Sequence, residues 1–226
     1  VRAFNLAEIY RTPVVLLLDE VIGHVNEKVE IPERVEVAER ETPDDPPESY
    51  LPYRITETDV PPMAKFGTGY RFHVTGLAHD ETGFPTNDPE KIAELLDRLH
   101  RKISRFEDQI IDVDVDLVEG AKIGVFAYGS TARSALRAAL RCREAGLPVS
   151  TVSPTTIWPF PTKAVRELAE QVDTIFVPEM NLGQIAHEVE WAARGKAEIV
   201  GYFRANGEPM SPHELEEKLR SMGGLS

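Results

Sequence analysis

The second half of the sequence alternates between short apolar runs and amphipathic segments. From Ala121 on, four runs have the composition of strands, namely KIGVFA, LPVSTV, DTIFV and AEIVGYF, and the segments between them repeat apolar residues at helical spacing. Four strands separated by helices need right-handed βαβ crossovers, which place the strands parallel to one another. The pattern predicts an α/β fold with a mostly parallel sheet over residues 120–226.

The first half of the sequence predicts a helix and a strand, followed by a long connector. A helix is expected over residues 3–11 and a buried strand over residues 14–18, a pair that usually belongs to a sheet already under way. This favours residues 1–24 as the tail of a domain that begins further upstream. Residues 25–119 are then an extended connector, and six prolines within residues 43–62 exclude a helix from that part of it.

Two elements are expected inside this connector. Asp88 is a plausible N-cap for a helix over residues 89–108, because apolar residues recur there at helical spacing. Residues 111–117 alternate apolar side chains with aspartates, which predicts an edge or linker strand. A disordered linker is the alternative for the proline-rich part, but aromatic residues such as Tyr50 favour a segment that packs on a neighbour.

Composition excludes several classes of function. The 226 residues are 42% hydrophobic, enough for a real core, and the net charge of -13 argues against nucleic acid or an anionic membrane as the main partner. The single cysteine, Cys142, excludes a disulfide framework and cannot hold an iron–sulfur cluster, which needs about four cysteine ligands. The longest apolar run, residues 13–18, is too short to cross a bilayer. We therefore expect a soluble, cytoplasmic protein.

Two loops follow strands of the predicted sheet, at the edge where parallel sheets place their functional groups. The turn YGST leads into a helix whose free N–H groups could bind an anion, although Ser130 or Thr131 as a simple cap is the favoured alternative. In the loop PEMNLG, one of Glu179 and Asn181 is expected to cap a helix while the other projects outward. The candidates for ligand or subunit contact in these loops are Tyr128, Gly129, Ser130, Thr131, Glu179 and Asn181.

The stretch GYRFHVTGLAHDETGFP concentrates polar side chains between glycines. Residues 69–74 resemble a strand that leads to a turn, and the histidines have no spacing typical of a metal site. No metal is expected, although a metal-dependent hydrolase using His73, His79 and Asp80 remains an alternative. The candidates for contact with a neighbouring element, subunit or anionic ligand are Arg71, His73, Thr75 and His79.

Four motifs in order, TPVVLLLDEVIGH, GYRFHVTGLAHDETGFPTND, GVFAYGSTARSA and FVPEMNLGQI, resemble the α subunit of 2-oxoacid:ferredoxin oxidoreductases, most closely the 2-oxoglutarate type. The resemblance implies that residues 1–24 end a pyrimidine-binding thiamine diphosphate domain and that residues 120–226 form a domain similar to the C-terminal domain of transketolase. It also implies decarboxylation of a 2-oxoacid, with coenzyme A as the second substrate and ferredoxin as the partner that is reduced, giving acyl-CoA and CO2.

The same resemblance implies that this chain acts only within an assembly. The family's catalytic glutamate would lie upstream of the position of Val1, so the catalytic residue is not identified here. Thiamine diphosphate with Mg2+ and the [4Fe-4S] cluster would be held mainly by a β subunit in an α2β2 complex. No cofactor is expected to bind to this chain alone. The alternative reading is a stand-alone α/β module that binds a phosphate-bearing ligand through residues 128–131.

Overall fold

The structure is a computed structural model that describes residues 1–224. Contacts divide the chain into two compact units, each described by itself below. The loop unit contains Val1–Leu17 and Lys28–Asp108, and the sheet unit contains Leu18–Glu27 and Gln109–Ser226. The boundaries expected from the sequence, after residues 24 and 119, refer to family domains and stay predictions.

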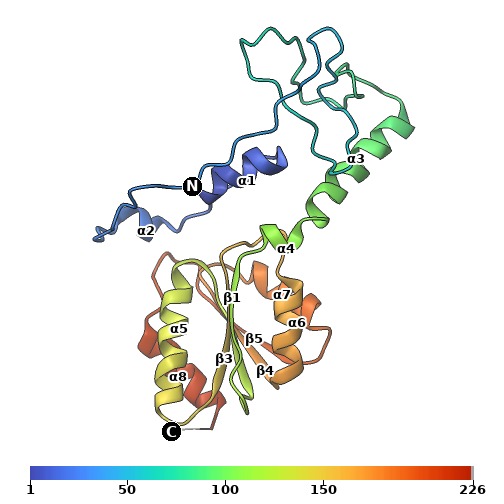
Figure 1. Cartoon of the computed structure of the whole chain (residues 1–226). Helices are drawn as coiled ribbons and strands as arrows, with labels where there is room; N and C mark the ends of the chain where they lie inside the picture. Colours follow the sequence, from blue (N-terminus) through green and yellow to red (C-terminus); the bar gives the residue numbers. More distant parts are fainter. Residues whose placement is uncertain (225–226) are drawn as a thin grey trace. The chain divides into compact units, whose positions relative to one another are not determined.

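The sheet unit contains five strands in the order β1-β3-β2-β4-β5. The pairs β2–β3, β2–β4 and β4–β5 are parallel, while β1 pairs antiparallel with β3 at one edge (Figure 1). This confirms the predicted α/β fold with a mostly parallel sheet and the edge strand expected near residues 111–117. The bounds are Val113–Asp116 for β1, Ile123–Phe126 for β2, Val149–Pro154 for β3, Thr174–Glu179 for β4 and Glu198–Phe203 for β5.

Helices cover both faces of the sheet. The helices α5 and α8 pack on one face, and α6 and α7 pack on the other (Figure 1). Successive side chains of a strand point to opposite faces, so Val125 joins the core under α5 and α8 while Phe126 joins the core under α6 and α7. The bounds are Gly129–Glu144 for α5, Thr162–Gln171 for α6, Gln184–Ala193 for α7 and Pro212–Met222 for α8.

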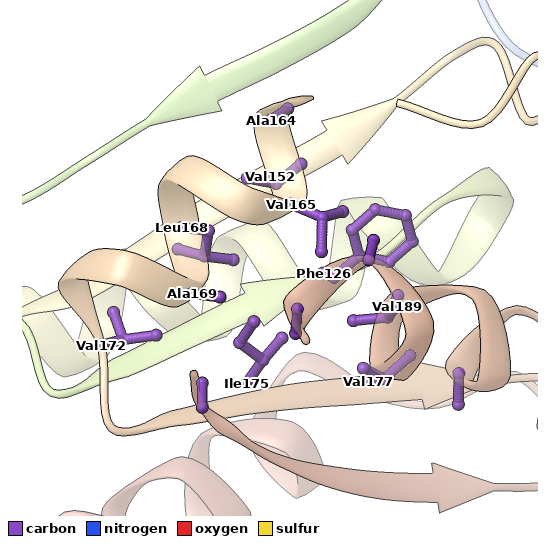
Figure 2. Packing of buried hydrophobic residues seen from close by; sticks show 14 of the residues in the cluster. Phe126, Val152, Ala164, Val165, Leu168, Ala169, Val172, Ile175, Val177 and Val189 are labelled. Carbon is purple, nitrogen blue, oxygen red and sulfur yellow. The ribbon is translucent and has the colours of Figure 1, made fainter. Parts of the chain in front are cut away.

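The core under α6 and α7 is shown in Figure 2. Leu168 and Val165 of α6 lie over Phe126 and Ile175 of the central strands, and all four side chains are buried. A Cβ atom added to Gly124 of β2 would lie 2.7 Å from Leu168 Cδ1, which is closer than van der Waals contact allows. The absence of a side chain at Gly124 therefore lets α6 approach the sheet closely.

The loop unit is built on α1 (Arg2–Tyr10) and α3 (Pro89–Ser104), and a short α4 (Glu107–Ile110) follows. The helices predicted over residues 3–11 and 89–108 are thus confirmed, the second with its last residues split off as α4. The Asp88 carboxylate caps α3 by accepting from the Glu90 N–H at 2.9 Å. Among the described residues, no helix is long and apolar enough to span a membrane.

The structure contradicts two predicted strands. Residues 69–74 form no strand, and the nearest pairing is an isolated bridge between His79 and Pro85. Residues 14–18 were expected to be a buried strand, but they pair with no strand among residues 1–224 and Leu17 is 75% exposed. Apolar composition favours burial, yet a strand also needs a neighbour that accepts its backbone hydrogen bonds, and no described segment supplies one.

Candidate functional site

Two loops meet at the edge of the sheet where the parallel strands end. Tyr128 follows β2, and its hydroxyl donates to Glu179 Oε2 at the end of β4 over 2.7 Å. Asn181, in the loop after β4, donates from Nδ2 to the Tyr128 oxygen over 2.8 Å. The prediction that residues 128–131 and 178–181 lie on the same edge is therefore confirmed.

Glu179 is the centre of this cluster and is only 1% exposed. Its carboxylate accepts from the backbone N–H groups of Ile185 (3.1 Å) and Ala186 (2.8 Å) in the first turn of α7. It also accepts from Asn181 Nδ2 at 2.9 Å, in addition to the Tyr128 hydroxyl. Three of the four donors bond to Oε2 and one bonds to Oε1, so the carboxylate caps α7 and fixes the loop. A buried carboxylate held in this way is suited to a structural role.

Asn181 caps the same helix from outside its first turn. Its Oδ1 accepts from the N–H groups of Gly183 (2.7 Å) and Gln184 (3.3 Å). The expectation that one of Glu179 and Asn181 caps the helix while the other projects outward is wrong, because α7 offers four unpaired N–H groups and both side chains accept from them.

Tyr128 acts as a donor in this cluster. Burial raises the pKa of its phenol well above the usual value, and the hydrogen bond to the Glu179 carboxylate raises the pKa further. The phenol therefore stays protonated at physiological pH, and its hydroxyl bridges the two loops. This environment does not suit a general base.

The turn at Gly129 is closed by a residue that the sequence analysis missed. Gly129 begins α5 with φ 60°, and the Ser130 N–H donates to Asp19 Oδ2 at 2.7 Å. Thr131 is buried inside the first turn, so the expectation that Ser130 or Thr131 caps the helix is wrong. A carboxylate of the chain itself already occupies the place where an external anion was considered, which disfavours the stand-alone phosphate-binding alternative.

In the loop unit, the histidines of the stretch GYRFHVTGLAHDETGFP do not converge. His79 is 6% exposed; its ring stacks on Tyr53 at a centroid distance of 5.0 Å, and its Nε2 lies 2.8 Å from Thr75 Oγ1. His73 is exposed and packs against Phe84, while its carbonyl accepts from the Tyr53 hydroxyl at 3.1 Å. Tyr53 therefore contacts both histidines and holds this loop in place.

The remaining polar residues of this stretch also point away from a shared metal. Arg71 is exposed, and Asp80 accepts from the Thr82 N–H at 3.0 Å and from Lys91 Nζ at 3.3 Å. Within residues 1–224, no group of three or more His, Cys, Asp or Glu side chains lies close enough to hold a metal ion. The described residues give the metal-dependent hydrolase alternative no ligand set.

Buried and half-buried cations hold the proline-rich part of the loop unit in place. Arg11 donates to the carbonyls of Pro52 and Pro61, and Arg98 donates to the carbonyl of Tyr53. Lys102 of α3, 5% exposed, donates to the Arg11 carbonyl at 3.0 Å. A segment rich in proline lacks N–H donors and forms no sheet, so its buried carbonyls need side-chain donors. The sequence analysis missed this role, because the partners are 41 to 91 residues apart.

Replacing Lys102 with methionine is expected to change how stability depends on pH. Burial, and to a lesser degree the charges of Arg11 and Arg98, lower the Lys102 pKa from 10.5 to about 8, against the opposing effect of Asp59. The folded chain thus binds fewer protons than the unfolded chain, so wild-type stability rises between pH 8 and 10.5. The shift corresponds to about 3 kcal/mol, of which we expect about half to remain after solvent screening.

The measurement is denaturant unfolding of both proteins below pH 8 and near pH 10.5. The variant lacks the bond to the Arg11 carbonyl at every pH, so the informative quantity is the loss of its stability relative to wild type as the pH rises. Lys91→Met is the matched control, because the Lys91 side chain is 51% exposed. A relative stability of the Lys102 variant that is flat across this window would contradict the prediction.

Comparison with known proteins finds two family models and several curated relatives that match this chain. Residues 1–98 match the family described as "Pyruvate flavodoxin/ferredoxin oxidoreductase, thiamine diP-bdg", and residues 121–215 match "Pyruvate:ferredoxin oxidoreductase core domain II". The chain is 44% identical, over 223 residues and 98% of its length, to the 2-oxoglutarate synthase subunit KorA of Methanothermobacter thermautotrophicus. The chain is a homologue of this KorA subunit. It spans 59% of the length of that relative.

Two further comparisons agree with this assignment. The KorA subunit of Methanocaldococcus jannaschii is 38% identical to this chain over 96% of this chain's length. The alignment covers 58% of that subunit. A solved 2-oxoglutarate:ferredoxin oxidoreductase from Magnetococcus marinus, with 2-oxoglutarate, coenzyme A and succinyl-CoA bound, superposes with a TM-score of 0.82 at 28% identity. That alignment covers 96% of this chain and 38% of the solved chain.

The residues described here do not by themselves fit thiamine diphosphate. A diphosphate with Mg2+ needs oxygen ligands for the metal, yet within residues 1–224 no group of three or more His, Cys, Asp or Glu side chains is placed to hold a metal ion. The cations Arg11, Arg98 and Lys102 donate to backbone carbonyls of the loop unit. Residues 1–98 match a thiamine diphosphate-binding family, but we derive no catalytic step through the cofactor from these residues.

Proposed function

We propose that this chain serves in a 2-oxoglutarate:ferredoxin oxidoreductase, which converts a 2-oxoacid and coenzyme A into acyl-CoA and CO2 while reducing ferredoxin. The observation that carries the proposal is 44% identity to a 2-oxoglutarate synthase subunit over 98% of this chain. The matches cover both units in the family's order, which a chance likeness of one α/β domain would not produce.

Within that enzyme, the chain is proposed to be a structural and docking part of an α2β2 assembly. Its single cysteine cannot hold the [4Fe-4S] cluster. Thiamine diphosphate, Mg2+ and the cluster would therefore be bound mainly by the β subunit. Residues 1–24 would belong to the pyrimidine-binding domain, 25–119 to the connector and 120–226 to core domain II.

The candidate residues divide by exposure into two proposed roles. Arg71, His73 and Thr75 are exposed on the loop unit and are available to a partner subunit or an anionic substrate. His79 and Glu179 are buried and fully engaged within the chain, so their proposed role is to hold the two loops in shape.

The test is an assay of 2-oxoglutarate-dependent reduction of a viologen dye, with coenzyme A and thiamine diphosphate present. The three arms are this chain alone, the full-length subunit alone and the full-length subunit with its β partner. We expect turnover only in the third arm, because the cofactor and the cluster require the partner. Turnover by this chain alone, or none by the complete assembly, would refute the proposal.

Arg71→Ala in the complete assembly separates a docking role from a substrate role. Loss of a contact with the β subunit would weaken assembly, whereas loss of a substrate contact would raise KM with assembly unchanged. Arg137→Ala is the matched control, because Arg137 is an exposed arginine on α5, in the other unit. Equal behaviour of the two variants would remove Arg71 from the list of functional residues.

A further inference from the structure

Residues 18–27 belong to the sheet unit, although the stretches before and after them in sequence belong to the loop unit. The anchor of this segment is Asp19, whose Oδ2 accepts from the Ser130 N–H at 2.7 Å. The same oxygen lies 3.0 Å from where a Cβ of Gly129 would stand. The Tyr128 side chain gives α5 no cap, so the first turn of α5 depends on a carboxylate 111 residues away in sequence.

A second contact fastens the other end of the segment. Glu27 Oε2 lies 3.4 Å from Arg133 Nη2, and both side chains are largely exposed. Arg133 lies four residues after Gly129 in α5, so the two contacts fall on the same side of the first two turns. Charge therefore holds both ends of residues 18–27.

The middle of the segment contributes little packing. The short helix α2 (Glu20–His24) has no buried residue, and its Ile22 is 36% exposed. Hydrophobic burial is the main force that holds surface segments closed, and here it is limited to the partly covered side chains of Val21 and Ile22. A segment with charge pairs near both ends and no fully buried side chain in its helix belongs to the parts of a protein that open at low free-energy cost.

We propose that residues 18–27 form a charge-held strap over the start of α5, which opens and closes as one piece and controls access to the sheet edge at Tyr128 and Ser130. This inference is independent of the proposed function, because it uses only contacts inside the sheet unit. The Asp19 charge also contributes to the raised pKa of the Tyr128 phenol, which places the carboxylate near the phenol as well as the helix. Opening the strap would expose the Tyr128 phenol and the Ser130 N–H.

The test is amide hydrogen exchange, followed by NMR on the full chain, in wild type and Asp19→Asn. Two amides report on the strap: Ser130, which donates to Asp19, and Ile22, which donates to the Asp19 carbonyl at 3.0 Å inside the strap. Asparagine keeps an acceptor oxygen but removes the charge, so both amides should exchange about tenfold faster. Wild-type exchange should also accelerate in about 1 M salt, where the Debye length falls to about 3 Å.

Glu20→Gln is the matched control, because it makes the same charge change in the same segment. The Glu20 side chain is 92% exposed, and its Oε1 lies 3.8 Å from His24 Nε2 within the same short helix. Acceleration of Ser130 without Ile22 would mean a fixed cap and would overturn the strap. Equal effects of the two variants, or no effect of salt, would overturn it too. General loss of protection, seen at Val125 in the core, would likewise count against a local opening.

Discussion

Replacing Glu179 with alanine is expected to lower the free energy of unfolding of the sheet unit by about 3–5 kcal/mol. The side chain is 1% exposed and accepts from two N–H groups of α7 and from Tyr128 and Asn181. Alanine would leave these four donors without an acceptor in a buried site. Each unsatisfied donor costs about 1–3 kcal/mol, and water that enters the space left by the side chain would offset part of the sum. Denaturant unfolding followed by circular dichroism measures the loss.

Glu179→Gln separates the lost charge from the lost volume. In wild type, Oε2 accepts from three donors and Oε1 accepts from the Ala186 N–H alone. The glutamine side chain therefore loses the fewest hydrogen bonds when its NH2 group takes the Oε1 position. Only the Ala186 bond is then lost, and we expect a cost of about 1–2 kcal/mol. Glu188→Ala, on the exposed face of α7, is the control for removing a glutamate from this helix. If the two alanine variants were equally stable, the capping role of Glu179 would be wrong.

The sheet unit could be predicted from its sequence because its signals are local. Each strand is a short apolar run, each helix repeats apolar residues at helical spacing, and caps such as Ser211 stand directly before their helices. The crossover rule then fixes the parallel arrangement, and with it the shared edge of Tyr128 and Glu179. Topology therefore placed both residues correctly.

The roles of the edge residues could not be predicted, because they depend on partners outside the local sequence. Asp19 accepts from Ser130 across 111 residues, and no spacing rule links the two. Polar residues after a strand are typical of a binding site, yet here Glu179 and Asn181 are engaged by the free N–H groups of α7. The same residue types serve capping and catalysis, and only the count of donors distinguishes the two.

The loop unit shows the same limit in another form. Residues 14–18 have the composition of a buried strand, but Leu17 is exposed and no described strand pairs with the run. The proline-rich part is ordered by donors such as Arg98 on a distant helix, which composition does not reveal. A sequence states which segments can form strands or turns, whereas burial depends on which other segments meet them.

Replacing Tyr53 with alanine is expected to destabilise the loop unit by about 2–4 kcal/mol and to leave the sheet unit unchanged. The Tyr53 ring stacks on His79 with an interplanar angle of 4°, and the Arg11 guanidinium lies 5.2 Å from its centroid. Its hydroxyl donates to the His73 carbonyl at 3.1 Å. One side chain thus joins Arg11, the C-cap residue of α1, to both histidines of the loop, and its removal releases all of these contacts.

The variant should show faster hydrogen exchange over residues 69–86, while exchange in the sheet unit stays at the wild-type rate. Tyr53→Phe is the matched control, because it keeps the stack and the ring beneath Arg11 and loses only the bond to the His73 carbonyl, at a cost of about 1 kcal/mol. If Tyr53→Phe were as disruptive as Tyr53→Ala, the hydroxyl would be the main tie and the stack secondary. If neither variant altered exchange in this loop, the interpretation of Tyr53 as its fastening point would be wrong. Retained protection in Tyr53→Ala would then point to the cation–carbonyl bonds of Arg11 and Arg98 as sufficient to order the loop unit.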